Sequence, residues 1–230
     1  MKVLVIEDSP EVTNSLRLCF KIRWPDAQIV AASHGAKGIE MVENESPDII
    51  ILDLGLPDMD GVEVLRTIRS FSQIPVVVLT VRRGEMDSVT CLEEGADDFI
   101  TKPFSALGLL ARIRAVLRRL QRLPADLSNT PFAAGNLLVN YASRQVSVSG
   151  RPVQLTPTEY SLLCYLISNR NRVLTHKAIL GELWGEEYDE VNTLKTFISQ
   201  LRRKLDDAGA DSTGMIASVR GVVYKFVSSA

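Results

Sequence analysis

The sequence predicts an α/β domain with a doubly wound, five-stranded parallel sheet, followed by a winged helix-turn-helix α+β domain. The first domain is indicated by apolar runs of β-favouring residues at 3–6, 49–52 and 76–79, which helix-period segments separate. Strands that are apolar on both faces belong in the middle of a parallel sheet covered by helices. The second domain is indicated by a change, after about residue 131, to short alternating strands and then three helices.

The first domain is expected to span residues 1–121. Shorter strands are predicted at 28–31 and 98–100, and helices at 11–22, 35–45, 62–70, 85–94 and 105–121. Five strands that alternate with five helices form one doubly wound domain. In such a sheet, ligands bind beyond the carboxyl ends of the strands, where the strand order reverses.

A linker is predicted at 122–131, because this segment contains two prolines and several small polar residues. The second domain, 132–230, is expected to begin with strands at 137–140, 145–148 and 153–155. Helices at 157–168, 175–184 and 191–206 follow, and a two-stranded hairpin at 217–227 ends the pattern. Strands, three helices and a terminal hairpin occur in this order in a winged helix.

The composition is that of a globular protein, which we expect in the cytoplasm. Apolar residues make up 46% of the chain and charged residues 23%, with a net charge of −2. No apolar run approaches the roughly 18 residues needed to cross a bilayer, and the first residues form a strand pattern, not a secretory signal. The three cysteines form no Cys-x-x-Cys pair, so neither a metal site nor a redox site is predicted from them.

Polar side chains follow four of the predicted strands. Glu7 and Asp8 follow the first, Asp53 ends the third, Thr80 ends the fourth and Lys102 follows the fifth. These residues should share one pocket, in which the repulsion between three carboxylates favours a hard cation such as Mg²⁺. A carboxylate can then attack a phosphoryl group, while the lysine and threonine hold its oxygens. A single acidic residue at a strand end is usually only a helix cap, but four such ends together favour a functional site.

Four motifs of the first domain resemble, in order, those of the receiver domains of two-component response regulators. They are Val-Ile-Glu-Asp at 5–8, Leu-Asp-Leu-Gly-Leu-Pro-Asp-Met-Asp-Gly at 52–61, Leu-Thr at 79–80 and Gly-Ala-Asp-Asp-Phe-Ile-Thr-Lys-Pro-Phe at 95–104. The resemblance implies a sensor histidine kinase as partner. It also implies that the domain is not an enzyme in the usual sense, since it promotes only its own phosphorylation and dephosphorylation.

The same resemblance implies a role for each pocket residue. Asp53 is implied to be the phosphoacceptor, and Lys102 is implied to pair with the phosphate. Thr80 and Phe99 are implied to be the switch residues, which move together on phosphorylation. The implied Mg²⁺ ligands, directly or through water, are Glu7, Asp8, Asp53 and the carbonyl of Gly55. The Lys102–Pro103 bond is implied to be cis.

The predicted helix at 191–206 has an apolar face and a basic, polar face. Leu194, Ile198, Leu201 and Leu205 fall on one side at about 100° per residue and should face a core. A polar outer face by itself predicts only an exposed helix. On a DNA-binding helix, however, amides and hydroxyls read base edges while Arg and Lys hold phosphates. The helix residues expected to contact DNA are Asn192, Lys195, Thr196, Ser199, Gln200, Arg202 and Arg203.

Five motifs of the second domain resemble the OmpR/PhoB-type winged helix. They are Leu-Thr-Pro-Thr-Glu-Tyr at 155–160, Arg-Val-Leu-Thr at 172–175, Leu-Trp-Gly at 183–185, Leu-Arg-Arg-Lys-Leu at 201–205 and Val-Arg-Gly-Val-Val-Tyr-Lys-Phe at 219–226. The resemblance implies binding to promoter DNA, with 191–206 as the recognition helix and Arg220 in the minor groove. It also implies that the acidic loop 185–190 meets RNA polymerase.

Similar regulators form a homodimer when phosphorylated, through the fourth helix, fifth strand and fifth helix. The charged residues at matching positions are Glu93, Asp97, Asp98, Arg112, Arg114 and Arg119. Intermolecular pairs such as Asp98–Arg112 are implied. Ser88 and Gly108 stand where another charge pair is common, so we expect a weaker dimer.

Two alternative functions remain open at this stage. A Mg²⁺-dependent phosphohydrolase would carry a second aspartate two residues after its nucleophile, whereas Gly55 stands at that position. A winged-helix regulator that acts without phosphorylation is disfavoured by the complete set of pocket residues.

Overall fold

The computed structural model describes residues 1–81, 85–121, 130–185, 188, 190–219 and 223–227, without the side chains of 85–88 and 120–121. The chain divides into two compact units, Met1–Leu117 and Arg118–Ala230. Within the described residues, no helix combines the length and the apolar character that a membrane span requires.

The first unit is built on a five-stranded sheet in which every neighbouring pair is parallel. The strands run in the order β2-β1-β3-β4-β5, which confirms the predicted doubly wound sheet. The strands are β1 (Lys2–Ile6), β2 (Gln28–Ala32), β3 (Ile49–Asp53), β4 (Val76–Thr80) and β5 (Asp98–Thr101). The helices are α1 (Pro10–Arg23), α2 (Gly35–Glu45), α3 (Gly61–Phe71), α4 (Glu85–Glu93) and α5 (Ala106–Gln121), of which the residues from Arg118 on belong to the second unit.

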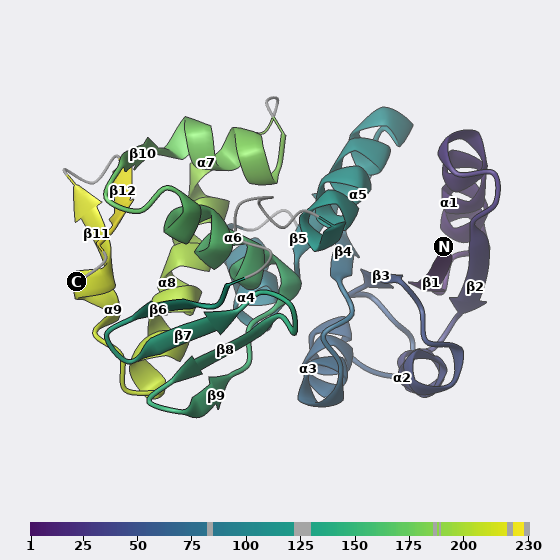
Figure 1. The fold of residues 1–230 in the computed structure, drawn as a ribbon. Coiled ribbons are helices and arrows are strands. Elements are labelled where there is room, and N and C mark those ends of the chain that lie inside the picture. The colour runs from purple at the N-terminus through teal and green to yellow at the C-terminus, as the bar shows by residue number, and fades with distance from the viewer. Residues whose placement is uncertain (82–84, 122–129, 186–187, 189, 220–222, 228–230) are drawn as a thin grey trace. The chain divides into compact units, whose positions relative to one another are not determined.

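Helices cover both faces of this sheet, so β3 and β4 are buried at every residue. Leu16 and Phe20 of α1 pack with Leu109 and Ile113 of α5 on one face, against alternate residues of the central strands. Figure 1 shows α1 and α5 on one side of the strands and α2 and α3 on the other. This burial on both faces explains why the central strands are continuous apolar runs in the sequence.

The register of the sheet aligns the carboxyl ends of its central strands. Ile6 pairs with Leu52, so the chain leaves β1 beside Asp53, the last residue of β3. The chain crosses from one side of β1 to the other between β2 and β3, and the strand order therefore reverses at β1 and β3. A doubly wound sheet binds its ligand at this point.

The loop between β3 and α3 is closed tightly over the end of β3. The Gly61 amide donates to the carbonyl of Leu54 at 3.0 Å, and the Asp60 side chain caps α3 by accepting from the Val62 amide at 2.9 Å. A Cβ atom on Gly61 would collide with the carbonyl oxygen of Asp53 and with the Cα of Leu54. Glycine is therefore required where α3 approaches the end of β3.

The second unit combines two antiparallel sheets with a helical core. The first sheet has the order β6-β7-β8-β9, and the second has the order β10-β12-β11. The strands are β6 (Phe132–Ala134), β7 (Leu137–Asn140), β8 (Gln145–Val148), β9 (Arg151–Val153), β10 (Val173–Thr175), β11 (Ile216–Val219) and β12 (Val223–Phe226). The helices are α6 (Pro157–Ser168), α7 (His176–Leu183), α8 (Val191–Asp207) and α9 (Ser212–Met215). These elements confirm the predicted winged helix.

Some elements of the second unit differ from the prediction. The strand predicted at 153–155 is β9 and ends at Val153, because Thr156 already caps α6: its side chain accepts from the Glu159 amide, and the Glu159 carboxylate accepts from the Thr156 amide. This reciprocal arrangement is a capping box. The short strands β6 and β10 and the single-turn helix α9 were not predicted. β10 forms through pairing of Leu174 with Tyr224, which is distant in the sequence.

A charged pair joins α6 to α8. Lys204 Nζ lies 2.6 Å from Glu159 Oε2, and the Glu159 side chain is almost fully buried. On its apolar face α8 buries Leu194, Ile198 and Leu205, as the sequence predicts. The helix is therefore held by its core face and at one flank, which leaves the remaining side for other contacts.

We predict that Gly61→Ala lowers the free energy of unfolding of the first unit by about 1–3 kcal/mol, the usual cost of overpacking. Differential scanning calorimetry measures this change. Gly181→Ala is the matched control, because a Cβ there meets no atom within 4 Å in the interior of α7. It should leave stability unchanged or raise it by about 0.5–1 kcal/mol. Equal effects of the two substitutions would contradict the prediction.

Candidate functional site

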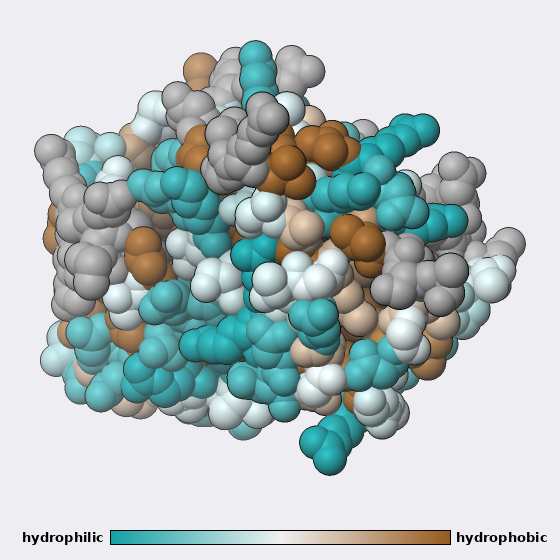
Figure 2. All heavy atoms as spheres, turned by 90° about the vertical axis from the view of Figure 1, so that its left-hand side faces the viewer, coloured by the Kyte–Doolittle hydropathy of each residue, from teal (hydrophilic) through white to brown (hydrophobic). Residues whose placement is uncertain are grey.

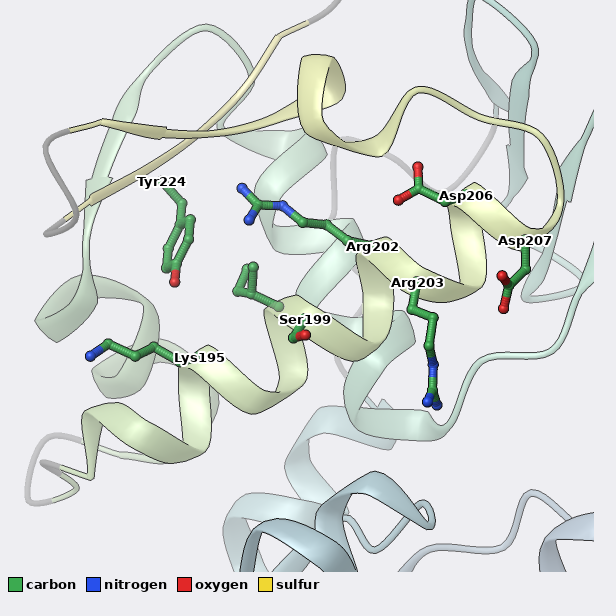
Figure 3. Close-up of a pocket in the computed structure, with 8 residues that line it drawn as sticks. Lys195, Ser199, Arg202, Arg203, Asp206, Asp207 and Tyr224 are labelled. Atoms are coloured by element: carbon green, nitrogen blue, oxygen red, sulfur yellow. The ribbon is translucent and has the colours of Figure 1, made fainter.

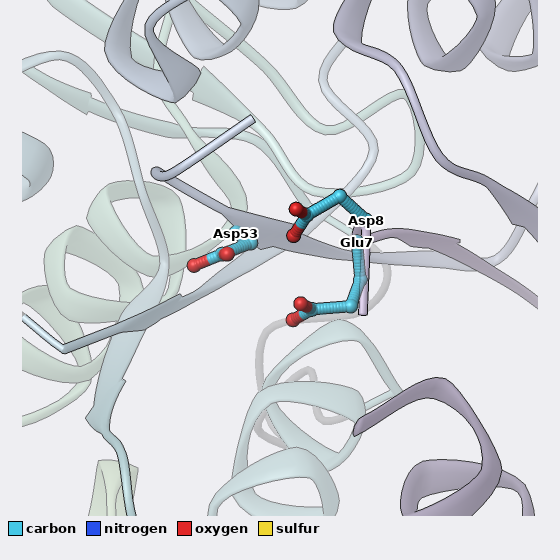
Figure 4. Close-up of side chains that lie close together, drawn as sticks. All are labelled: Glu7, Asp8 and Asp53. Atoms are coloured by element: carbon cyan, nitrogen blue, oxygen red, sulfur yellow. The ribbon is translucent and has the colours of Figure 1, made fainter. Parts of the chain in front are cut away.

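Three carboxylates meet at the carboxyl ends of β1 and β3. Glu7, Asp8 and Asp53 each offer an oxygen atom, and these atoms all lie within 4.8 Å of one another. Figure 4 shows the three side chains pointing toward one space. Glu7 and Asp53 are buried, whereas Asp8 is exposed. The sequence predicted this cluster, and the register of β1 with β3 produces it.

Lys102 lies between the two buried carboxylates. Its Nζ atom is 2.6 Å from Glu7 Oε2 and 3.1 Å from Asp53 Oδ2. The Lys102 amide donates to the carbonyl of Thr80 at 2.7 Å, which places this residue at the end of β4. The Lys102–Pro103 bond is cis, as the resemblance implies. Burial raises the pKa of Glu7 above its ordinary value, the hydrogen bond from Lys102 opposes that rise, and the charge of Asp53 adds to it.

The other predicted pocket residues occupy the same edge or its neighbourhood. A Cβ atom built on Gly55 would lie 3.6 Å from Asp53 Oδ2, so the Gly55 backbone is close to that carboxylate. Thr80 is buried at the end of β4, and Phe99 is half-buried on β5. The Asp53 carboxylate also accepts from the Leu54 amide at 2.9 Å, which orients it.

The donor set suits a hard divalent cation. Three carboxylates and a nearby carbonyl supply oxygen atoms, the ligands that Mg²⁺ prefers, and exposed Asp8 leaves one side of the cluster open to water. Among the described residues, Glu7, Asp8 and Asp53 are the acidic, histidine or cysteine side chains that lie close enough together, as a set of three, to share one metal ion. The ammonium of Lys102 compensates part of the negative charge.

The polar face of α8 borders a groove of about 380 Å³ in the second unit. Lys195, Ser199, Arg202 and Arg203 of α8 line this groove together with Tyr224 of β12. Figure 3 shows Arg202 extending toward the side of Tyr224, while Arg203 points away from that ring. Asp206 and Asp207 close the groove at the end of the helix. Figure 2 looks onto the side of the second unit that carries β11 and β12, where hydrophilic residues gather in the lower part of the view and hydrophobic ones lie higher up.

The predicted contact residues of α8 differ in exposure. Asn192, Lys195, Ser199 and Arg203 are exposed, and Arg202 is half-buried. Thr196 and Gln200 are buried, with 9% and 4% of their surface exposed. Thr196 Oγ1 donates to the carbonyl of Asn192 at 3.0 Å, and Gln200 Oε1 accepts from Arg203 at 3.1 Å. Arg220 lies outside the described residues.

Arg202 spans from α8 to the terminal hairpin. Its guanidinium donates to the carbonyl of Ile216 and, at 3.0 Å, to Ser218 Oγ. The same group lies 5.9 Å from the centre of the Tyr224 ring. This residue therefore connects the polar face of α8 to both strands β11 and β12.

Comparison with known proteins gives the family. Residues 3–114 match the response regulator receiver domain, and residues 150–226 match the family described as transcriptional regulatory protein, C terminal. The chain is a response regulator of the OmpR/PhoB type. The phosphohydrolase alternative is thereby excluded. The buried acidic cluster lies in its receiver domain, and α8 lies in its DNA-binding domain.

Similar regulators match over nearly their whole length. The transcriptional regulatory protein KdpE of Mycobacterium tuberculosis is 38% identical over 97% of this chain and 98% of its own. YclJ of Bacillus subtilis, an uncharacterized transcriptional regulatory protein, is 38% identical over 98% and 99%. The sensory transduction protein RegX3 of Mycolicibacterium smegmatis is 36% identical over 97% of each.

Solved structures show the same fold. A RitR mutant, C128S, aligns with a TM-score of 0.81 at 25% identity over 99% of both chains. DrrB of Thermotoga maritima, an OmpR/PhoB homologue, aligns with a TM-score of 0.51 at 24% identity over 98% of both.

The charged residues expected at a receiver dimer face are placed in different ways. Glu93 and Arg114 are exposed. Asp98 lies 3.2 Å from Arg112 of the same chain and is fully buried. Arg119, which belongs to the second unit, is also buried: within that unit its side chain donates to Thr158 Oγ1 at 2.7 Å and lies over the Trp184 ring at 4.8 Å. The side chain of Ser88 is outside the described residues, and Gly108 is exposed.

Asp97 forms a buried ion pair with a residue that sequence analysis missed. Its carboxylate lies 2.9 Å from the guanidinium of Arg69, at 0% and 9% side-chain exposure, and accepts from the Val76 amide at 3.0 Å. Arg69 also donates to the carbonyls of Ile74 and Gly95. Nothing in the spacing of Arg69 marks it, because an arginine in the last turn of a helix is ordinary.

We predict that Arg69→Ala destabilises the receiver domain by roughly 3–5 kcal/mol, because it leaves the Asp97 carboxylate buried without its charged partner. Urea unfolding measures the change. Arg66→Ala is the matched control: Arg66 also lies on α3 and pairs with Glu94 at 2.7 Å, but its side chain is 62% exposed. An exposed pair contributes about 1 kcal/mol or less. The prediction fails if the two variants lose equal stability.

Proposed function

We propose that this response regulator accepts a phosphoryl group on Asp53 from the phosphohistidine of a sensor kinase and then binds promoter DNA as a homodimer. The observation that supports this most is the position of Asp53. Its carboxylate is buried beside Glu7 and Asp8 and lies 3.1 Å from the ammonium of Lys102. A buried carboxylate held against a cation is oriented for reaction at one of its oxygens.

In the proposed transfer, an oxygen of Asp53 forms the new P–O bond as the P–N bond to the kinase imidazole breaks. The imidazole keeps the electron pair of that bond. Lys102 then exchanges its contact with Asp53 for one with a phosphoryl oxygen, because a charge-assisted hydrogen bond to phosphate is strong. Asp53 pairs in the sheet with Leu79, so the next residue, Thr80, lies near it and supplies a hydroxyl for another phosphoryl oxygen. Its movement, together with Phe99, is the proposed switch.

Mg²⁺ is the proposed cofactor, held by Asp8, Asp53 and the Gly55 carbonyl, with Glu7 acting through water. When bound, the ion neutralises charge on the incoming phosphoryl group. The oxygen donors fit this ion. With it, the receiver domain promotes its own phosphorylation and dephosphorylation.

The groove along α8 supports the choice of exposed residues for DNA contact. We propose that Asn192, Lys195, Ser199 and Arg203 contact DNA directly from the recognition helix. Arg202, which is hydrogen-bonded to β11 of the terminal hairpin, would contact DNA beside that hairpin. Arg220 would enter the minor groove. Thr196 and Gln200 are buried here, so their contact with DNA would require a change in their surroundings.

Further parts of the proposal rest on the family resemblance. The receiver domain spans 1–121, the linker 122–131 and the DNA-binding domain 132–230. Dimerisation uses the face that carries Glu93, Asp97, Asp98, Arg112, Arg114 and Arg119. The loop 185–190 contacts RNA polymerase, and the regulator acts in the cytoplasm. Of this loop, residues 186, 187 and 189 lie outside the described part of the chain.

We predict that a small phosphodonor with Mg²⁺ adds about 80 Da to the wild-type protein, the mass of one phosphoryl group. Intact-mass spectrometry measures it. Asp53→Asn should gain nothing, because an amide is not a nucleophile toward phosphorus. Asp60→Asn, which replaces an exposed aspartate of the same loop, is the control and should gain the same mass as the wild type. A gain in Asp53→Asn would place the acceptor elsewhere, and no gain in any protein would favour a regulator that acts without phosphorylation.

We also predict that Lys195→Ala and Arg203→Ala weaken binding to any DNA sequence and reduce the dependence of log K on log salt by about one each, as loss of a phosphate contact does. Fluorescence anisotropy at several salt concentrations measures both quantities. Lys37→Ala, an exposed lysine of α2 in the receiver domain, is the charge-matched control and should leave the slope unchanged. Unchanged slopes in the two α8 variants would show that these residues do not contact phosphates.

A further inference from the structure

The loop between β3 and α3, which carries Gly55, is hydrogen-bonded to helix α2, which lies outside the acidic cluster. Asp58, in the loop between β3 and α3, accepts two hydrogen bonds from the first turn of α2. The Gly35 amide donates to Asp58 Oδ1 at 2.8 Å, and the Ala36 amide donates to Asp58 Oδ2 at 3.0 Å. Both oxygens of one carboxylate therefore bind the start of one helix.

This contact replaces a cap that α2 lacks in its own sequence. His34 occupies the N-cap position, and its side chain forms no capping hydrogen bond. The first amides of a helix have no partner within the helix, and a carboxylate near them is also favoured by the helix dipole. The two hydrogen bonds, that from Ala36 first, lower the pKa of Asp58 below its ordinary value. α2 is thus capped by the loop after β3.

Packing at the same place is close. A Cβ atom on Gly35 would lie 2.6 Å from Met59 Cγ and 2.6 Å from Val64 Cγ2. Met59 belongs to the loop and Val64 to α3, so the absence of a side chain at Gly35 lets α2 contact both. α2 and α3 lie side by side on one face of the sheet (Figure 1). The outer end of the loop cannot shift without disturbing the start of α2.

The inner end of the loop is fixed beside the acidic cluster. The Leu54 carbonyl accepts from the Gly61 amide, and Gly55 forms an isolated bridge with Asp60. Gly55 is exposed, and a Cβ built on it would lie 3.6 Å from Asp53 Oδ2. The Gly55 backbone therefore lies between two fixed points of the loop. Leu54 is hydrogen-bonded to the start of α3, and Asp58 is hydrogen-bonded to the start of α2.

We propose that Asp58 is a positioning residue for magnesium binding: by holding the loop against the first turn of α2, it sets the position of the Gly55 carbonyl. This inference rests on the proposed phosphorylation of Asp53 with Mg²⁺. Asp58 itself does not touch the ion or the reacting atoms. Residues that orient metal ligands commonly matter almost as much as the ligands, since a displaced carbonyl binds more weakly.

The first test is a Mg²⁺ titration of the full chain by isothermal titration calorimetry. Asp58→Ala should weaken Mg²⁺ binding by roughly tenfold, as loss of an orienting partner does. Asp58→Asn keeps one acceptor oxygen, so its affinity should fall between those of Asp58→Ala and the wild type. Asp48→Ala is the matched control, because Asp48 is an exposed aspartate that accepts from the Lys2 amide at 2.7 Å, at the start of β1. It should bind Mg²⁺ like the wild type.

A second readout separates positioning from simple stabilisation. In amide NMR spectra of the wild type, Mg²⁺ should shift the resonances of Gly35 and Ala36, because the loop transmits the change at Gly55 to α2. In Asp58→Asn the amide that has lost its acceptor should respond less, while the Gly55 resonance still shifts. A cap that only stabilises α2 would leave the affinity for Mg²⁺ unchanged, and Mg²⁺ would not shift the Gly35 and Ala36 resonances of the wild type.

The outcomes distinguish the two proposals. If the wild type does not bind Mg²⁺, the proposed phosphorylation chemistry fails and this inference fails with it. If the wild type binds Mg²⁺ and both Asp58 variants bind it equally well, the inference is overturned while the proposed function stands, even if the melting temperature falls. If Asp58→Ala does not fold, Asp58→Asn carries the test in the same way.

Discussion

The register between β1 and β3 is the constraint on which the receiver site depends. It places the buried carboxylates of Glu7 and Asp53 side by side, where each would repel the other in a low-dielectric setting. The ammonium of Lys102 relieves that repulsion by contacting both. The three elements that end at this point, β1, β3 and the segment after β5, are thus held by the sheet on one side and by charge on the other.

Buried charge pairs elsewhere in the molecule connect secondary-structure elements to one another. The buried pair of Arg69 and Asp97 joins the end of α3 to the segment before β5, and the pair of Lys204 and Glu159 joins α8 to α6. Each connects two elements through a carboxylate that is nearly inaccessible to water, so each is costly to break. The first borders β5 of the receiver domain, which carries Phe99, and the second supports α8 of the DNA-binding domain. Both pairs hold elements in place, β5 and α8, that carry residues of the proposed functions.

Residue types and spacing predicted much of the site, and tertiary packing decided the rest. The four strand-end motifs were sufficient to find Glu7, Asp53, Thr80 and Lys102, because parallel strands must end at the same edge. Exposure could not be found in the same way. Thr196 and Gln200 look polar and therefore exposed on a helical wheel, yet they are buried. Asp97 likewise suggests a surface charge until Arg69 is seen beside it.

The sequence by itself determined the two domains, the parallel sheet, the winged helix and the family, because each follows from local periodicity or from contiguous motifs. It did not determine β10, which exists only through pairing with the distant β12. Nor did it reveal the link from Asp58 to the start of α2, which joins residues 22 and 23 positions apart. Such contacts form between segments whose proximity is a product of the whole fold, so tertiary structure alone decides which polar groups become partners.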